Sequence, residues 1–198
     1  MLIFPQFYLA FTIIALCLAI AASGTNVTDV LRYDRLAIGE HEYWRLISSH
    51  FVHLSWMHLL MNLLGLMLVF FFFFSVYTVR AWIGLLLFSS LLTGLLILIF
   101  NAEIRWYVGL SGTLHGLFIA GALGNLRVRR LESIALLVLL TIKLAWEQLM
   151  GPLPGSEETA GGPVLVDAHF FGAISGLIFY FLFGLLDRSK AEAGEREN

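Results

Sequence analysis

Six apolar stretches of helical length, separated by short polar segments, decide what this chain can fold into. They lie at about residues 3–23, 56–77, 81–100, 109–126, 132–150 and 168–187. About 20 apolar residues carry a helix across a bilayer, where a helix satisfies its own backbone hydrogen bonds. Only 13% of the residues are charged and 59% are hydrophobic, whereas soluble domains are about 25% charged. We therefore predict an all-α, polytopic membrane helix bundle with six transmembrane helices, forming one domain over residues 1–198.

The basic residues are distributed unequally between the two ends of such a bundle. Seven of them follow the second, fourth and sixth spans and so share one side: Arg80, Arg127, Arg129, Arg130, Arg188, Lys190 and Arg196. Lys143 lies within the fifth span, and the opposite side holds Arg32, Arg35, Arg45 and Arg105. Because cytoplasmic loops carry an excess of Lys and Arg, we predict that both termini are cytoplasmic. The outward-facing segments are then 25–55, 101–108 and 151–167.

The first apolar run has a second interpretation. It ends in Ala19-Ile20-Ala21-Ala22-Ser23, which is similar to a signal-peptide cleavage site. A signal peptide begins with a positively charged region, and no Lys or Arg precedes this run. We therefore favour a retained first span, in which the single cysteine, Cys17, serves packing.

A serine between glycines opens the fourth apolar run, in the segment Gly109-Leu110-Ser111-Gly112. Small neighbours let other backbone segments approach and leave the serine uncovered. The free N–H groups of a helix N-terminus can also hold a developing anion. The alternative is that Ser111 caps the helix and the glycines serve helix packing.

A histidine, His169, opens the sixth apolar run and precedes a G-x-x-x-G pattern at Gly172 and Gly176. This pattern favours tight packing of the span on a neighbour. The fourth span is a candidate neighbour because several of its glycines lie on or near one face: Gly112, Gly116 and Gly121. Such packing would bring His169 within reach of the serine, and a hydrogen-bonded base is what activates a serine. An interfacial histidine bonded to a loop is the alternative.

Histidines also cluster where the second span begins, at His50, His53 and His58, with Asn62 one turn further on. His58 and Asn62 are four residues apart and share a helix face. Both side chains can donate hydrogen bonds to an oxyanion. Metal binding and simple interfacial placement are the alternatives, but the spacing is not H-E-x-x-H and no carboxylate lies between the histidines. We predict neither a metal nor a cofactor.

Three further polar features have more than one interpretation. His115 lies four residues after Ser111, so the two side chains can face each other and His115 is itself a candidate base. Lys143 and Glu147 form an i,i+4 pair inside the fifth span, either structural or part of a proton path; we favour the structural interpretation. Asp167 precedes His169 by two residues and either orients it or is solvated.

Taken together, these motifs resemble the rhomboid family of intramembrane serine proteases. The resemblance covers nearly the whole chain and rests on four motifs in order: Glu42-Tyr43-Trp44-Arg45, His53-x4-His58-x3-Asn62, Gly109-Leu110-Ser111-Gly112 and Ala168-His169-x2-Gly172-x3-Gly176. It implies a rhomboid-like bundle with the active site in a water-filled cavity below the outer surface. It also implies that substrates enter beside the second and fifth spans, with the fifth span and segment 151–167 as the gate.

The resemblance implies a role for each motif residue. Ser111 would be the nucleophile and His169 the general base of a dyad that lacks an acidic third member. The oxyanion hole would consist of the Ser111 backbone N–H, His58 and Asn62. The supporting residues would be Gly109, Gly112, His115, and, in structural roles that hold the first loop against the bundle, His53, Trp44 and Arg45.

The stretch Leu114-His115-Gly116 resembles one branch of this family in particular. Many rhomboids have a tyrosine at the position of His115, stacked on the catalytic histidine. The histidine here, together with the short chain, resembles the rhombosortase branch of bacterial rhomboids, whose members are similar to processing enzymes for surface proteins with a C-terminal Gly-Gly-rich sorting tail. His115 could stack, share a proton with His169 or replace it as base; we expect it to stack or tune.

The predicted function is therefore cleavage of transmembrane segments of membrane-anchored proteins in the bacterial inner membrane. The predicted partners are those substrates and the lipid bilayer. No nucleic acid is expected, since the sequence has no basic stripe with aromatics, and the oligomeric state is open. A catalytically inactive rhomboid-like protein that binds membrane segments is one alternative. A transporter with His53, Lys143 and Glu147 as a polar path is another, but it leaves the serine and histidine motifs unexplained.

Overall fold

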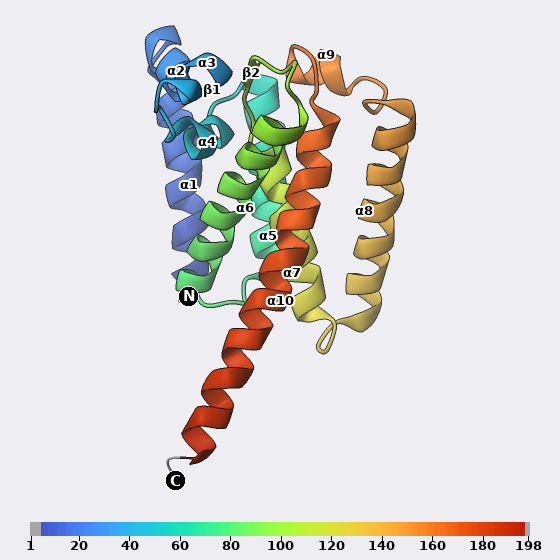
Figure 1. The fold of residues 1–198 in the computed structure, drawn as a ribbon. Helices are drawn as coiled ribbons and strands as arrows, with labels where there is room; N and C mark the ends of the chain where they lie inside the picture. The colour runs from blue at the N-terminus through green and yellow to red at the C-terminus, as the bar shows by residue number, and fades with distance from the viewer. Residues whose placement is uncertain (1–4, 197–198) are drawn as a thin grey trace.

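The computed structural model describes residues 5–196 and the side chains of residues 5–182. It is 76% helical. The long helices of this part of the chain lie side by side (Figure 1) and are α1 (Pro5–Ala22), α5 (Trp56–Phe73), α6 (Val79–Phe100), α7 (Ser111–Asn125), α8 (Arg130–Met150) and α10 (Val166–Arg196). The chain enters α1 at one end of the bundle, and α10 leaves it at the same end (Figure 1).

Four of these helices, α1, α5, α6 and α8, are long and apolar enough to cross a membrane. This confirms a multi-pass membrane protein. The predicted fourth span corresponds to the shorter α7, and the sixth to the apolar segment Val166–Leu182 of α10, so the six-span layout stays a prediction. The start of the predicted first span at residue 3, and the side chains of Arg188, Lys190 and Arg196, lie outside the described residues.

Helix α7 can be short because it occupies the middle of the bundle. Most of its side chains from Gly112 to Ala122 are buried, and it contacts α5, α6, α8 and α10. In contrast, α8 contacts α7 and α10 and leaves much of its surface exposed, with large side chains such as Leu139 and Ile142 more than 60% exposed. Helix α7, which carries Ser111, is thus enclosed by other helices, whereas α8 lies at the periphery of the bundle.

The short elements gather at the end opposite the termini (Figure 1). They are α2 (Thr25–Leu31), β1 (Tyr33–Asp34), α3 (Arg35–Gly39), α4 (Arg45–Ser48), the 3-10 helix Ser49–Phe51, β2 (Trp106–Tyr107) and α9 (Ser156–Ala160). Strands β1 and β2 pair antiparallel, Tyr33 opposite Tyr107 and Asp34 opposite Trp106. The fold is thus nearly all-α, with a short strand pair that the sequence did not predict, formed because the segment after α6 satisfies its backbone groups against the first loop.

Arg35 joins the first loop to the end of α6. Its guanidinium donates hydrogen bonds of 2.7–3.1 Å to the carbonyls of Ile97, Leu98, Asn101 and Ile104. The last carbonyls of a helix have no partner within the helix. The guanidinium therefore caps the C-terminal end of α6 and fixes the path of the chain toward α7.

The predicted tight packing of the sixth apolar run on the fourth is confirmed. A Cβ atom added to Gly116 of α7 would lie 2.6 Å from Ser89 Oγ and 2.8 Å from the backbone oxygen of Gly172 in α10. A Cβ atom on Gly112 would lie 2.7 Å from the Ala168 oxygen. The backbones of α7 and α10 are thus in direct contact, as glycine faces permit. Gly121 lies elsewhere than predicted, since its Cβ would meet Phe73 of α5 at 2.8 Å.

Replacing Gly116 with alanine will destabilise the protein by about 1–3 kcal/mol, the usual cost of an extra group in a packed interior. The backbone of α10 cannot move away without separating the helices. The measurement is the thermal unfolding midpoint in detergent. Gly39→Ala is the matched control, because no atom lies within 4 Å of its added Cβ. Equal midpoints for the two variants would contradict the close contact of α7 and α10.

Candidate active site

The chain reaches Ser111 through a glycine that no other residue could replace without strain. Gly109 has φ +124, and an added Cβ would lie 2.9 Å from the His58 ring. Its N–H donates to the Ser49 oxygen at 3.1 Å, and its carbonyl accepts from the Tyr107 hydroxyl at 2.9 Å. These contacts place Ser111 as the first residue of α7, where backbone N–H groups have no partner within the helix.

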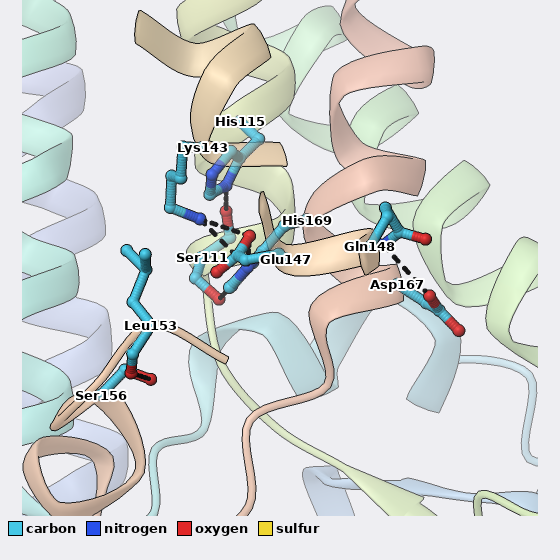
Figure 2. A network of polar contacts seen from close by, with 9 residues as sticks. All are labelled: Ser111, His115, Lys143, Glu147, Gln148, Leu153, Ser156, Asp167 and His169. Atoms are coloured by element: carbon cyan, nitrogen blue, oxygen red, sulfur yellow. Dashed lines mark hydrogen bonds and ion pairs between the residues drawn. The ribbon is translucent and has the colours of Figure 1, made fainter. Parts of the chain in front are cut away.

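The structure brings Ser111 and His169 together, although 58 residues separate them. Ser111 Oγ lies 2.9 Å from His169 Nε2, and His169 is 7% exposed. The contact follows from the glycine-mediated packing of α7 on α10, as the sequence predicted. Figure 2 shows the two side chains facing each other. This is hydrogen-bond distance between a hydroxyl and a base.

A carboxylate occupies the other side of the His169 ring. Glu147 Oε2 lies 2.9 Å from His169 Nδ1 and accepts a hydrogen bond from Lys143 Nζ at 2.6 Å. Glu147 is only 3% exposed. The predicted Lys143–Glu147 pair is therefore present, but it lies against the candidate base (Figure 2). The contact with His169 was missed because the i,i+4 spacing explains the ion pair within α8 alone.

His115 stacks on His169, with ring centroids 4.5 Å apart and an interplanar angle of 22°. Its Nδ1 donates to the Ser111 backbone oxygen at 2.7 Å. Of the three alternatives for His115, this geometry matches stacking. Asp167 does not bond to His169, since its carboxylate accepts from Asn101 at 2.6 Å and from Gln148 at 3.2 Å.

The two candidate oxyanion donors lie on one face of α5, as predicted. His58 Nδ1 accepts from the Leu54 N–H at 3.4 Å, so the neutral ring carries its proton on Nε2, near Gly109. Asn62 Nδ2 donates to the His58 carbonyl at 2.9 Å. This uses one of the two hydrogens of the amide nitrogen, and the second is free to act as a donor. Both side chains border the hollow that contains Ser111.

Two hollows meet at Ser111, and His58 and His169 line both of them. One, of about 420 Å³, lies between segment 103–108 and segment 163–165. The other, of about 610 Å³, lies between α5, α7, α8 and segment 153–156. Its lining is largely apolar, with Met61, Phe118 and Leu140 among the side chains. A chain lying through both hollows would pass the Ser111 hydroxyl.

His50 and His53 lie beside this site rather than in it. His50 Nδ1 pairs with Thr113 Oγ1 of α7 at 3.0 Å, and burial lowers the pKa of His50 to about 4. The His53 ring packs edge-on against His58 with centroids 5.1 Å apart. Burial, followed by the charge of the neighbouring His58, lowers the pKa of His53 to about 3. Both rings are therefore neutral near pH 7.

Arg45 and Trp44 lie in the first loop. Arg45 is 7% exposed, pairs with Glu42 at 2.6 Å and donates to the backbone oxygens of Asp29 and Arg32 at 2.7 and 2.9 Å. Trp44 is half exposed, and its indole N–H lies 3.4 Å from the Val30 oxygen. These contacts lie within the first loop, whereas the resemblance implied that both residues hold the loop against the bundle; that role stays a prediction.

One trio of side chains has the spacing of metal ligands. The ligand atoms of His115, Glu147 and His169 lie within 4.8 Å of one another. However, the Lys143 ammonium lies 2.6 Å from the Glu147 carboxylate and 3.3 Å from His169 Nδ1. A second cation there would be repelled by the first. The arrangement is better suited to moving a proton than to holding a metal.

These features define a multi-pass membrane protein with a serine–histidine pair in a cavity between its helices. Residues 40–185, well over half of the chain, match the family model of the Rhomboid domain. The chain belongs to the rhomboid family, and this membership indicates a protein of the intramembrane serine protease kind. No curated protein matches the chain.

Proposed function

We propose that this protein is an intramembrane serine endopeptidase that cleaves transmembrane segments of membrane-anchored proteins. The observation that carries the proposal is the 2.9 Å contact of Ser111 Oγ with His169 Nε2 at the junction of the two hollows. Polar groups at membrane depth are costly, and a reactive pair beside a cavity explains their placement. Membership of the rhomboid family supports the same activity.

The proposed reaction begins when Ser111 Oγ attacks the scissile carbonyl and its proton passes to His169 Nε2. The oxyanion accepts hydrogen bonds from the Ser111 backbone N–H, His58 Nε2 and the free hydrogen of Asn62. His169 then gives its proton to the leaving amine, and the C–N bond breaks. Water resolves the acyl-enzyme in a second attack, or another amine does so if the chain acts in surface-protein sorting.

The proposed substrate path runs through the larger hollow. It lies between α5 and α8, and its wall is mostly apolar, which suits a segment leaving the lipid. Helix α8 and segment 151–167 form the proposed gate, because α8 packs mainly on α7 and α10 among the long helices and leaves much of its surface exposed. The segment unwinds before it reaches Ser111, and glycines favour unwinding since each costs a helix about 1 kcal/mol relative to alanine.

The substrate preference follows from the rhombosortase branch, to which we assign the chain on Leu114-His115-Gly116. His115 takes the place of the tyrosine of other rhomboids, since its ring stacks on His169. The substrates are then surface proteins with a C-terminal Gly-Gly-type tail. The proposed location is the bacterial inner membrane with six spans and both termini cytoplasmic. Figure 1 supports this layout, since the chain enters and leaves at one end and the short elements lie at the other.

The test is cleavage of a membrane-anchored reporter that carries a Gly-Gly-type C-terminal tail, in membranes that contain the protein. A matched reporter has both glycines replaced by leucine, which stabilises the substrate helix. We expect cleavage of the first reporter and at least about tenfold slower cleavage of the second. Equal rates would contradict the tail preference. Failure to cleave either reporter, or a general rhomboid substrate, would contradict the protease function and favour a binding protein.

His115→Phe will retain measurable cleavage, within about tenfold of the native rate, because phenylalanine preserves the ring stack on His169 and loses the hydrogen bond to the Ser111 oxygen. His115→Ala, which loses both, will be slower than His115→Phe. The measurement is the initial rate with the tailed reporter. If His115→Phe is inactive while His169→Ala is active, His115 is the base and the assignment is wrong.

A further inference from the structure

The buried carboxylate of Glu147 is not explained by the serine–histidine pair alone. It is 3% exposed and lies 2.9 Å from the ring nitrogen of His169 that faces away from Ser111. Burying a charge is costly unless it is paired and hydrogen-bonded. Lys143 and His169 are its two partners, so the ion pair of α8 and the candidate base form one network.

We propose that Glu147 is a positioning residue that makes the Ser111–His169 pair a triad, and that Lys143 tunes this triad. This inference rests on the proposed protease function. It departs from the dyad that the family resemblance implied, because here a third, acidic side chain contacts the base. The carboxylate belongs to α8, whereas Ser111 and His169 are brought together by the contact of α7 with α10.

The tautomer of His169 decides whether the ring can take the serine proton. A carboxylate can only accept, so the 2.9 Å contact requires the proton on Nδ1. Nε2 is then an acceptor, and it lies 2.9 Å from Ser111 Oγ. This is the tautomer that can take the serine proton. During the attack Glu147 stabilises the imidazolium that forms, as the third member of a Ser-His-Asp triad does.

Lys143 also affects which nitrogen of His169 carries the proton. Its ammonium can only donate, and it lies 3.3 Å from His169 Nδ1. A hydrogen bond from Lys143 to Nδ1 would force the proton onto Nε2, and Nε2 could no longer accept the serine proton. Glu147 prevents this, because it draws the ammonium to 2.6 Å and holds Nδ1–H at the same oxygen.

The charges around His169 have opposing effects on its protonation. Glu147 favours the imidazolium and Lys143 opposes it, both from α8. The other titratable groups facing the ring are His115 of α7, which stacks on it, and His58 of α5, which lies near enough to interact electrostatically. Asp167, on α10 itself, is bonded to Asn101 and Gln148. Removal of Glu147 or Lys143 should therefore shift the pH dependence in opposite directions.

The experiment compares Glu147→Gln and Lys143→Met with the native protein in detergent. One readout is the rate at which a fluorophosphonate probe modifies the protein. In that reaction Ser111 Oγ bonds to phosphorus, fluoride leaves and His169 takes the proton. The other is kcat and KM for the tailed reporter from pH 5 to 9. Glu132→Gln is the matched control on α8, because Glu132 is exposed and paired with Arg129.

For Glu147→Gln we expect kcat and the labelling rate to fall about 100-fold with KM unchanged. A triad carboxylate-to-amide change can cost about 10⁴-fold, but His115 still supports the ring here. The acid limb of the pH–kcat/KM profile moves to lower pH in Glu147→Gln and to higher pH in Lys143→Met. Glu147→Asp restores part of the rate, and Glu132→Gln matches the native protein.

Two results would overturn the triad. One is a Glu147→Gln variant that is folded by its unfolding midpoint and reacts within threefold of the native rate. The other is a rate loss with no shift of the acid limb and no rescue by aspartate, which would make Glu147 merely structural. Failure of the proposed function is distinct: the native protein would then be labelled no faster than Ser111→Ala, whatever residue 147 is.

Discussion

Ser111→Ala will reduce cleavage of the tailed reporter by about 10⁶-fold, the loss that follows removal of a serine nucleophile elsewhere. The variant keeps the fold, because the alanine Cβ occupies the same place in the first turn of α7 and only the hydroxyl facing His169 is lost. The measurement is the initial cleavage rate in membranes, with the unfolding midpoint as a check. His169→Ala will fall to a similar level.

The control for this pair is Ser156→Ala, since Ser156 borders the same hollow but its hydroxyl donates to the Leu153 oxygen at 2.7 Å. Its rate should stay within about threefold of native. The double variant Ser111→Ala/His169→Ala should be no slower than either single variant, because residues that act as a unit are not additive. Cleavage that survives Ser111→Ala would exclude the serine mechanism.

His58→Ala will lower kcat by about 100- to 1,000-fold, as loss of one oxyanion donor does. The reason is the direction of its proton: with Nδ1 accepting from Leu54, Nε2–H is the donor beside Gly109. Since the oxyanion exists only during the reaction, KM should change little. The measurement is kcat and KM for the tailed reporter, and Asn62→Ala should give a smaller loss of the same kind.

His41→Asn is the control for His58, because His41 is exposed in the first loop and asparagine tolerates its positive φ of 76. It should retain the native rate. A loss that appears in KM, with kcat unchanged, would show that His58 binds the substrate rather than the oxyanion. The same result would also contradict the tautomer assigned to its ring.

Much of the bundle and the central contact could be predicted from the sequence, for identifiable reasons. The period of small residues from Gly112 and from Gly172 encodes a close helix contact, so the meeting of Ser111 and His169 follows from local patterns. Gly121 does not follow this pattern. It is near the same helix face by spacing, yet it packs on Phe73, because α5 and α10 approach α7 from different directions.

The role of α8 could not be predicted in the same way. Lys143 and Glu147 satisfy each other within one helix, so their spacing gives no reason to expect a third partner. Which partner they meet depends on how α8 docks on α7 and α10, and that is a property of the whole bundle. The same holds for β1 and β2, whose pairing depends on segments about 70 residues apart.

The hydrogen bonds of Arg35 and the β1–β2 pair together limit how far this protein can be shortened at its N-terminal side. The family match begins at residue 40, yet Tyr33 and Arg35 hold the segment that leads into Ser111. A fragment trimmed to 40–185 would leave the carbonyls at the end of α6 without their guanidinium. The family match therefore leaves out residues before position 40 that hold the segment leading to Ser111 in place.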